Sequence, residues 1–318
     1  MLPHPRALHI PVMAQEALRW LAVRPDGTYV DATAGAGGHS SLIAPLLHTG
    51  RLVALDRDPA AVALAGERLK TFPRACVVHA NYSDLNQVLR DAGIAGVDGV
   101  LIDAGVSSMQ IDSPDRGFSL EADGPLDMRM DPGSGPSAAE WLASVGEDTL
   151  AEALRSLGDV GPARRIAKAI LQRQRAGRMT RTADLAAAVR EALDFVRGEP
   201  GEVRTVFQAV RISVNRELEC LRRGLESAVD ALNPGGRLVV ISFHSGEDRI
   251  VKDAFRAWSR TERELERDGR VRSVRGPRLL LPVAGPVTPS DDETRSNPRS
   301  KSAKMRVAER RATAAAEE

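Results

Sequence analysis

Three glycines close together, followed by an acid further along the chain, are the residues that most clearly point to chemistry. Gly35, Gly37 and Gly38 come soon after a short apolar run, and a second apolar run, 52–55, ends on Asp56. Glycines let a backbone approach a bound molecule closely, and an acid at the tip of a strand can bind ribose hydroxyl groups. The pattern therefore predicts a nucleoside-binding site.

The spacing of these glycines favours a methyltransferase over a nicotinamide-dependent dehydrogenase. A dinucleotide-binding loop carries the pattern GxGxxG, but Ser40 stands at the third glycine position here. S-adenosylmethionine (SAM) has no phosphate groups and tolerates a looser turn, with Asp31 and Ala36 in the predicted site. Asp58 precedes a proline and is explained as a helix N-cap, whereas Asp56 has no predicted structural role. A ribose contact is therefore the favoured interpretation of Asp56.

The elements that must position these residues alternate regularly over the first third of the chain. The expected strands are 28–30, 52–55, 75–78 and 97–102, and the expected helices are 38–47, 59–70 and 83–91, the last capped by Ser83. Such alternation predicts an α/β fold with a parallel, doubly wound sheet. Asp31, Asp56 and Asp103 each follow a strand. Because ligands bind beyond the carboxyl ends of parallel strands, the three acids are expected at one site.

The alternation stops after residue 103 and resumes near residue 237. Residues 104–136 have no clear period, and helices are expected at 138–145, 148–157, 162–175 and 182–197. A helix over 207–232, a strand over 237–242, a helix over 246–267 and weaker strands at 278–283 and 303–308 are expected to follow. The pattern predicts a sheet domain of residues 1–110 and 215–318, interrupted by a small all-α domain of residues 111–214.

The composition is that of an ordinary globular protein. Of 318 residues, 42% are hydrophobic and 27% are charged, with a net charge of +1. No apolar run approaches the roughly 20 residues that span a bilayer, and no leader pattern is visible, so we expect a cytoplasmic protein without a membrane partner. Cys76 and Cys220 are too few for a disulfide framework and too isolated for a zinc site, so no metal is predicted.

Charge is distributed unevenly along the chain. Residues 111–160 hold three basic and eleven acidic side chains, whereas residues 164–181 hold seven basic side chains and no acid. A basic run of this kind is either a solvated helix face or a phosphate-binding patch. Charge alone leaves both interpretations open.

Longer motifs, spread over almost the whole chain, resemble one family. They are DATAGAGGHS at 31–40, LIDAGVSSMQID at 101–112, GPLDMRMD at 124–131, FQAVRISVNRELE at 207–219, ISFHSGEDRIVK at 241–252 and NPRSKSAKMRVAER at 297–310. In these segments the chain resembles the bacterial small-subunit ribosomal RNA (rRNA) cytosine-N4-methyltransferases. The resemblance implies a Rossmann-like class I SAM-dependent methyltransferase core with an inserted small all-α domain.

The resemblance also implies an activity, the SAM-dependent N4-methylation of a cytosine in the decoding centre of 16S rRNA. The family's SAM-contacting positions correspond here to Gly37, Gly38, His39, Asp56, Tyr82, Asp103 and Gln110. The implied partner is 16S rRNA within the small ribosomal subunit, and dimerisation stays open. A catalytically silent RNA-binding or ribosome-assembly factor on the same fold is the alternative. Intact acids and glutamine at the cofactor positions argue against it.

Asp103 is the leading candidate for a direct role in catalysis. A cytosine amine is a poor nucleophile, and an acceptor that binds its N–H groups favours the reactive, pyramidal form. A role of Asp103 in cofactor binding alone stays open. Ser107 and Ser108, in the loop that follows, and His244, at the tip of the expected fifth strand, are weaker candidates. Beside His244 we expect a helix cap in which Ser245 pairs with the residue three positions further on.

Candidate RNA-binding residues lie in the predicted insertion. Arg116 and Arg129 are near its start, and Arg129 either binds phosphate or pairs with a neighbouring acid. Trp141 either stacks on a flipped base or belongs to the core of the insertion. Basic residues on the helix that follows would contact RNA backbone without reading its sequence. These residues are Arg164, Arg165 and Lys168.

Overall fold

The computed structural model describes residues 11–312 except 195–197, 199 and 266–270. The chain divides into two compact units. The sheet unit comprises the residues up to Gly105 and those from Leu218 onward, and the helical unit is the continuous segment Val106–Glu217. These boundaries lie a few residues from those expected at 110/111 and 214/215.

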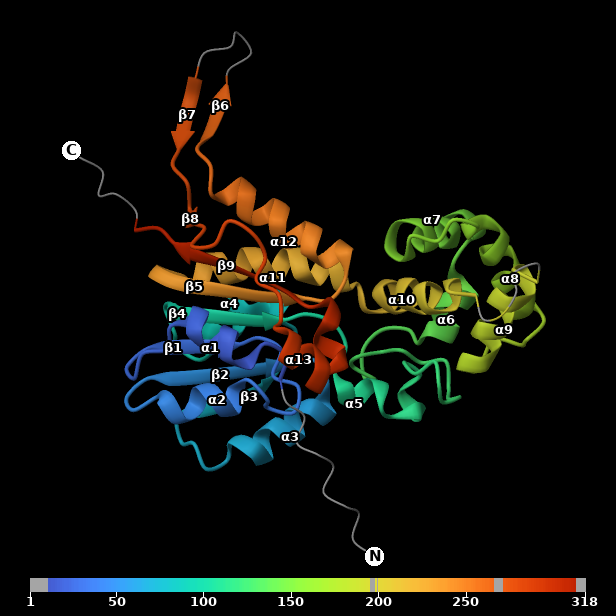
Figure 1. The fold of residues 1–318 in the computed structure, drawn as a ribbon, viewed down its shortest axis with the longest axis horizontal. Coiled ribbons are helices and arrows are strands. Elements are labelled where there is room, and N and C mark those ends of the chain that lie inside the picture. Colours follow the sequence, from blue (N-terminus) through green and yellow to red (C-terminus); the bar gives the residue numbers. More distant parts are fainter. Residues whose placement is uncertain (1–10, 195–197, 199, 266–270, 313–318) are drawn as a thin grey trace, which may run out of the picture. The chain divides into compact units, whose positions relative to one another are not determined.

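A seven-stranded sheet forms the centre of the sheet unit (Figure 1). Its order is β3-β2-β1-β4-β5-β9-β8, in which β1 to β5 are parallel and β9 runs antiparallel to both β5 and β8. The strands are β1 (Thr28–Asp31), β2 (Arg51–Asp56), β3 (Ala75–His79), β4 (Val97–Asp103), β5 (Leu232–Ser242), β8 (Leu279–Leu280) and β9 (Lys304–Arg310). The predicted α/β class is confirmed, with antiparallel strands added at one edge.

Strand register brings the three predicted acids to one edge and one face of the sheet. Asp31 is opposite Ala54 on β2 and opposite Leu101 on β4. Asp56 and Asp103 follow these two partners by two residues, so each projects beyond Asp31 along its own strand. Because side chains alternate between faces with a period of two, all three carboxyl groups point to the same face.

Helices cover both faces of this sheet. One apolar cluster packs β1, β2 and β4 against α11 and α12, with Leu225 and Val251 among its buried residues. The cluster on the other face includes Tyr29 and Leu101 from the sheet and Leu21 from α1. The helices of the sheet unit are α1 (Ala14–Leu21), α2 (Ser40–Ile43), α3 (Pro59–Leu69), α4 (Leu85–Asp91), α11 (Glu217–Ala231), α12 (Ser245–Trp258) and α13 (Asp291–Ser296).

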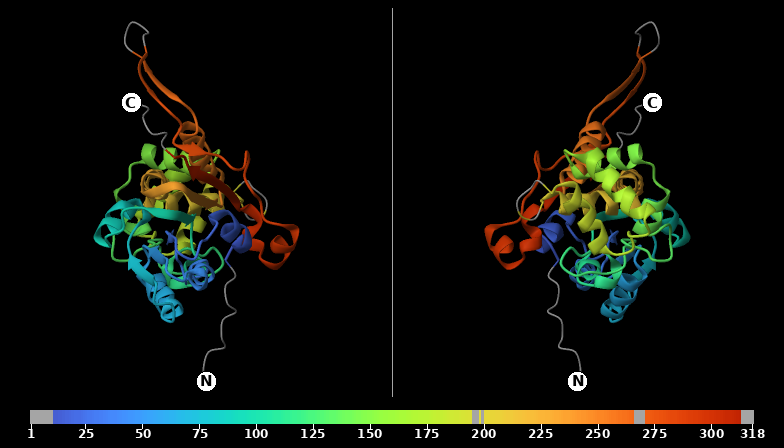
Figure 2. Two further views of the ribbon diagram at one scale, coloured as in Figure 1. Left: turned by 90° about the vertical axis from the view of Figure 1, so that its left-hand side faces the viewer. Right: turned by 90° about the vertical axis from the view of Figure 1, so that its right-hand side faces the viewer.

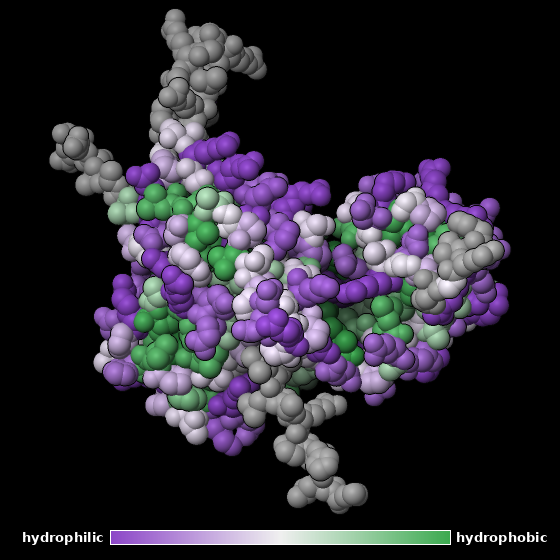
Figure 3. Space-filling model, viewed as in Figure 1, coloured by the Kyte–Doolittle hydropathy of each residue, from purple (hydrophilic) through white to green (hydrophobic). Residues whose placement is uncertain are grey.

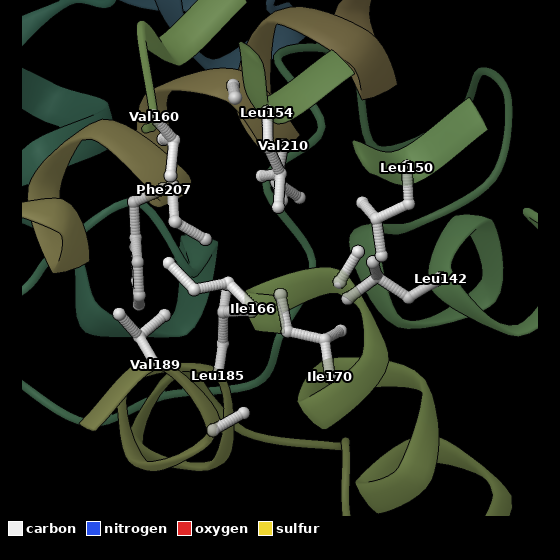
Figure 4. Packing of buried hydrophobic residues seen from close by; sticks show 14 of the residues in the cluster. Leu142, Leu150, Leu154, Val160, Ile166, Ile170, Leu185, Val189, Phe207 and Val210 are labelled. Carbon is white, nitrogen blue, oxygen red and sulfur yellow. The ribbon is translucent and has the colours of Figure 1, made fainter. Parts of the chain in front are cut away.

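The helical unit has a core of its own (Figure 4). Its helices are α5 (Ser108–Ile111), α6 (Ala138–Ser144), α7 (Glu147–Gly158), α8 (Ala163–Arg175), α9 (Thr182–Ala192) and α10 (Glu202–Asn215). Apolar residues at helical spacing, such as Leu150 and Leu154 on α7 or Ile166 and Ile170 on α8, meet in its centre. The expected helix 182–197 ends at Ala192, and residues 195–197 lie outside the described part.

Two expected helices beyond residue 206 are wrong. The expected helix 207–232 is two helices, because Arg216 between α10 and α11 adopts a left-handed conformation with φ of 50°. The expected helix 246–267 ends at Trp258, and β6 (Glu262–Leu265) then pairs antiparallel with β7 (Val271–Arg275). Charged residues between apolar ones gave this segment a helical pattern, and residues 266–267 of the expected helix lie outside the described part of the chain.

A third error concerns the start of the expected helix 83–91. The cap is Asn81, whose side chain accepts a hydrogen bond from the backbone nitrogen of Ser83 at 3.0 Å. A short 3-10 turn, η2 (Tyr82–Asp84), then leads into α4.

Among the described residues, no helix is long and apolar enough to cross a membrane.

Candidate functional site

The loop between β1 and α2 is built around glycine conformations. Gly35 has φ of 53° and Gly37 has φ of 79°, which a residue with a side chain rarely adopts. The loop continues the sheet on both sides, since Ala32 N donates to Leu101 O at 2.8 Å and Ala34 N donates to Leu55 O at 2.7 Å. The backbone that a nucleoside would approach is therefore held rigidly by β2 and β4.

Asp31 shapes this loop from within. Its side chain is fully buried, and its Oδ2 accepts a hydrogen bond from Ser40 Oγ at 2.6 Å, while Oδ1 accepts one from Thr33 N at 3.3 Å. Burial raises the pKa of Asp31 above its ordinary value. Ser40 stands where a dinucleotide loop has its third glycine, and this hydrogen bond gives the serine a structural reason. A direct contact between Asp31 and the cofactor stays a prediction.

Asp56 holds the glycine loop from the neighbouring strand. Its Oδ2 accepts a hydrogen bond from Gly35 N at 2.7 Å, and its Oδ1 accepts one from Asp58 N at 2.8 Å. The expectation that Asp56 has no structural role is therefore wrong. Asp58 caps α3 as expected, by accepting a hydrogen bond from Ala60 N at 3.0 Å. Each oxygen of Asp56 keeps a second lone pair that a ribose hydroxyl could use.

The buried His39 and the partly buried Asp103 form an acid–base pair beside the loop. His39 Nε2 lies 3.6 Å from Asp103 Oδ2, and His39 is only 5% exposed. Burial alone would lower the pKa of His39, but Asp103 and the charges of Asp31 and Glu293 raise it above its ordinary value. The backbone nitrogen of Asp103 donates to Thr33 Oγ1 at 2.7 Å, which fixes the tip of β4.

Two buried polar atoms of this pair are available to a ligand. Asp103 Oδ1 and His39 Nε2 have no hydrogen-bond partner among the residues that the structure describes. Buried polar groups normally have partners, so these atoms indicate where a polar molecule binds. SAM fits the residues present: its cationic groups suit the three acids, its ribose suits Asp56, and its backbone contacts suit the glycine loop.

The remaining predicted cofactor residues have local roles in the fold. A Cβ atom on Gly224 of α11 would lie 2.3 Å from the Tyr82 ring, so this ring packs against α11. Ala36 O accepts a hydrogen bond from Arg68 at 3.4 Å. Gln110, in the helical unit, is buried and accepts a hydrogen bond from Ser107 N at 3.0 Å. Their direct contacts with SAM stay predictions.

The weaker catalytic candidates are placed by helix caps. Ser107 Oγ accepts a hydrogen bond from Gln110 N and so caps α5, which begins at Ser108. His244 caps α12, because its Nδ1 accepts hydrogen bonds from Gly246 N at 3.2 Å and Glu247 N at 3.3 Å. These bonds give Ser107 and His244 structural work that needs no catalytic role.

The expected cap at Ser245 is wrong by one residue. Glu247 completes the box instead, since its Oε2 accepts hydrogen bonds from His244 N and Phe243 N. The residue expected to pair with Ser245, Asp248, binds Arg306 at 2.7 Å. Histidine and serine start equally spaced patterns here, so local sequence alone could not choose the register.

Three of the predicted RNA-binding residues are engaged inside the helical unit. Arg129 forms two hydrogen bonds with Asp127, at 2.8 and 2.7 Å, which selects the ion-pair interpretation. Arg116 donates to the carbonyl groups of Arg129 and Met130, both at 2.9 Å. Trp141 is partly buried and packs against the helical core, as its structural interpretation expected.

The basic residues of α8 lie on its solvent face. Arg164, Arg165 and Lys168 are exposed, and the residues between them are buried. Arg164 pairs with Asp148 at 2.8 Å and Arg165 pairs with Asp194 at 3.2 Å. Exposed ion pairs of this kind contribute little to stability. A phosphate group could therefore replace the acid as the partner of either arginine. In Figure 3, hydrophilic side chains cover much of the visible outer edge of the helical unit.

Sequence reasoning missed three residues that support the site. Thr33 Oγ1 accepts a hydrogen bond from Asp103 N, and Ser40 Oγ donates one to Asp31. Both residues stand in the glycine motif, where their hydroxyl groups could have indicated such a role. The negative charge of Glu293, in the C-terminal part of the chain, contributes to raising the pKa of His39. Its sequence context gave no such signal, because SDDE at 290–293 resembles an ordinary helix cap.

Comparisons with known proteins show the family to which the chain belongs. Ribosomal RNA small subunit methyltransferase H of Thiobacillus denitrificans is 49% identical over 312 residues, covering 97% of this chain and 99% of that protein. The protein of the same name from Nitrosococcus oceani is 46% identical over 305 residues, covering 95% and 96%. A crystal structure of an rRNA methylase from Streptococcus thermophilus matches with a TM-score of 0.42 and 10% identity, covering 96% of this chain and 100% of that one, a similarity too low to support an inference. The model of the MraW methylase family matches residues 6–311, and the chain therefore belongs to this family of methylases.

Proposed function

We propose that the protein transfers the methyl group of SAM to the N4 amine of a cytosine in the decoding centre of 16S rRNA, within the small ribosomal subunit. SAM is the methyl donor of this enzyme family. The observation that carries the proposal is the pair of the partly buried Asp103 and the buried His39 at the tip of β4, next to the glycine loop. The relatives named as small-subunit rRNA methyltransferases support the class of substrate.

The residues divide into those that hold the cofactor and one that addresses the amine. SAM supplies an electrophilic methyl group, and transfer needs the amine nitrogen, the methyl carbon and the sulfur in line. Asp56 would bind the ribose, and the glycine loop would hold the nucleoside against the ends of β1 and β2. Most of the rate enhancement of such a reaction comes from positioning.

In this proposal, Asp103 is the group that activates the amine. Its Oδ1 is buried and has no hydrogen-bond partner among the described residues, so it can accept an N–H of the cytosine. This contact favours the pyramidal nitrogen and stabilises the positive charge that develops on it. The carboxylate is also a suitable acceptor for the proton that the amine loses after transfer. His39 Nε2 lies 3.6 Å from the other oxygen of Asp103, so a protonated imidazole would favour the carboxylate form.

The direct test is methyl transfer from labelled SAM to small ribosomal subunits that lack the modification, followed by nucleoside analysis of the digested RNA. We expect the label in N4-methylcytidine. Label in another nucleoside would contradict the proposed target. SAM binding without transfer to any RNA substrate would instead favour the silent RNA-binding factor.

SAM affinity should depend on the ionisation of Asp56. Burial raises the pKa of this carboxyl from 3.8 to about 6. Because the carboxylate is the better acceptor for ribose hydroxyls, affinity should fall as the pH drops through about 6, approaching tenfold per pH unit below it. Calorimetric titrations from about pH 5 to about pH 8 would measure this dependence.

The Asp56→Asn variant is the matched control for this titration. It should bind SAM more weakly at neutral pH and show no step near pH 6; a step that persists would assign the titration to another group. The free energy of unfolding should depend on the ionisation of Asp56 with the opposite sign to SAM affinity. The folded state binds the extra proton between about pH 4 and about pH 6, so the contribution of Asp56 to the free energy of unfolding falls as the pH rises through that window.

A further inference from the structure

The C-terminal part of the chain returns to the N-terminal segment beside the glycine loop. In Figure 2, α13 lies next to α1 in both views. Val287 and Met305 form an isolated antiparallel bridge, with two backbone hydrogen bonds of 2.8 Å. The residues between them, which include α13, thus leave the sheet at one fixed point and rejoin it there.

Glu293 on α13 makes a contact that its local sequence does not predict. Ser290 caps α13 by accepting a hydrogen bond from Glu293 N at 3.2 Å. In an ordinary capping box the glutamate would reach back to the backbone of the capping serine. Here Glu293 Oε1 accepts a hydrogen bond from the backbone nitrogen of Met13 at 2.6 Å, across 280 residues of sequence.

Met13 lies at a sharp bend that brings its neighbours to the glycine loop. It is fully buried and adopts a left-handed conformation, with φ of 51° and ψ of 39°, just before α1. That conformation is unfavourable for a residue with a side chain, so surrounding contacts must maintain it. A Cβ atom on Gly38 would lie 3.2 Å from Pro11, two residues before Met13. Fixing the Met13 amide therefore fixes the residue that packs on Gly38.

The carboxylate of Glu293 also acts on His39, which directly follows Gly38. Three acids from different elements raise the pKa of this imidazole through their negative charges: Asp103 from β4, Asp31 from β1 and Glu293 from α13. Their negative charges favour the protonated imidazole, against the effect of burial. Glu293 is the member of this group that comes from outside the strand tips.

We propose that Glu293 is a positioning residue of the SAM site, whose carboxylate fixes residues 11–13 against the glycine loop and maintains negative charge beside His39. The inference rests on the proposed placement of SAM at this loop. The C-terminal segment would then take part in cofactor binding through the hydrogen bond of Glu293 with Met13 N and through the charge of Glu293.

Two variants separate the hydrogen bond from the charge. Glu293→Gln keeps an oxygen that can accept the Met13 N–H but removes the charge, and Glu293→Ala removes both. Asp292→Ala is the matched control, because Asp292 is an exposed neighbour on α13 that pairs with Arg295. SAM affinity would be measured by calorimetry, and the His39 imidazole would be titrated by NMR in the protein without SAM.

We expect Glu293→Ala to bind SAM about tenfold more weakly than wild type, the effect of losing one charge-assisted hydrogen bond. In Glu293→Gln, His39 should titrate at lower pH, and Asp292→Ala should match wild type in both measurements. If Glu293→Ala binds SAM as tightly as the control, or if His39 titrates in Glu293→Gln as it does in the control, the proposal is overturned. Circular dichroism would establish that the alanine variant is folded; if it is not, the nearly isosteric glutamine variant decides through the His39 titration.

The two levels of the proposal can fail separately. A wild-type protein that does not bind SAM would contradict the proposed function. The NMR titration needs no SAM, so it would still show whether Glu293 acts on His39.

Discussion

Replacing Asp103 by asparagine is expected to lower the rate of methyl transfer about 100- to 1000-fold, the effect of removing one well-placed acceptor from a developing charge. The substitution keeps the size of the side chain and the backbone contact of Asp103 N with Thr33 Oγ1. It removes the negative charge that His39 faces at 3.6 Å and the carboxylate oxygen that would accept the amine N–H. Single-turnover transfer to small ribosomal subunits would give the rate, and calorimetry would give SAM affinity.

The two measurements distinguish the roles that the sequence left open for Asp103. A large loss in rate with nearly unchanged SAM affinity would support a direct contact with the amine. A loss in SAM affinity with an unchanged rate at saturation would contradict it and make Asp103 a cofactor-binding residue alone. His244→Asn is the matched control, because asparagine is also a good N-cap and the variant removes only the imidazole. We expect it to react at nearly the wild-type rate.

Reversing the charge of three α8 residues is expected to weaken RNA binding about 100-fold near 0.1 M salt. The substitutions are Arg164→Glu, Arg165→Glu and Lys168→Glu. The three side chains lie on the exposed face of α8, and their ion pairs with Asp148 and Asp194 are exposed as well. Each lost phosphate contact reduces counterion release, so the slope of log affinity against log salt should decrease by about two to three units.

The control must match the change in net charge. Charge reversal at Lys70, Arg74 and Arg90, three exposed residues of the sheet unit, supplies the same change. We expect this variant to keep most of its RNA affinity, and SAM affinity should be unchanged in both triple variants. An unaltered salt slope in the α8 variant would identify its basic face as merely solvated.

The sequence by itself determined the parallel part of the sheet and the loop that carries the site. Buried parallel strands are continuous apolar runs, and a turn needing positive φ demands glycine, so β1, β2 and β4 were readable locally. The acids at Asp31, Asp56 and Asp103 were likewise readable, because each directly follows its strand. The register of the sheet then places them on one face, which their position at the strand ends did not by itself determine.

Where the sequence allowed two local structures of similar energy, only the tertiary structure decided between them. The sequence has two acids near Arg129, Asp127 and Asp131, and in the structure Arg129 forms hydrogen bonds with Asp127. The break at Arg216 interrupts a segment of good helical periodicity. Asn215 just before it binds the backbone of Met128 and Met130, at 2.7 and 2.8 Å. These partners lie more than 80 residues away, so periodicity could not reveal the break.

The contacts that complete the site are also long-range. Asp56 binds Gly35 through the pairing of two strands, and Glu293 reaches Met13 across 280 residues. A sequence pattern reports the propensities of neighbouring residues and the faces that they bury, but not which distant donor a carboxylate will find. That choice follows from how the strands pair and where the C-terminal segment rejoins the sheet. The sequence thus determined the class of chemistry, and the tertiary structure decided which residues hold its parts in place.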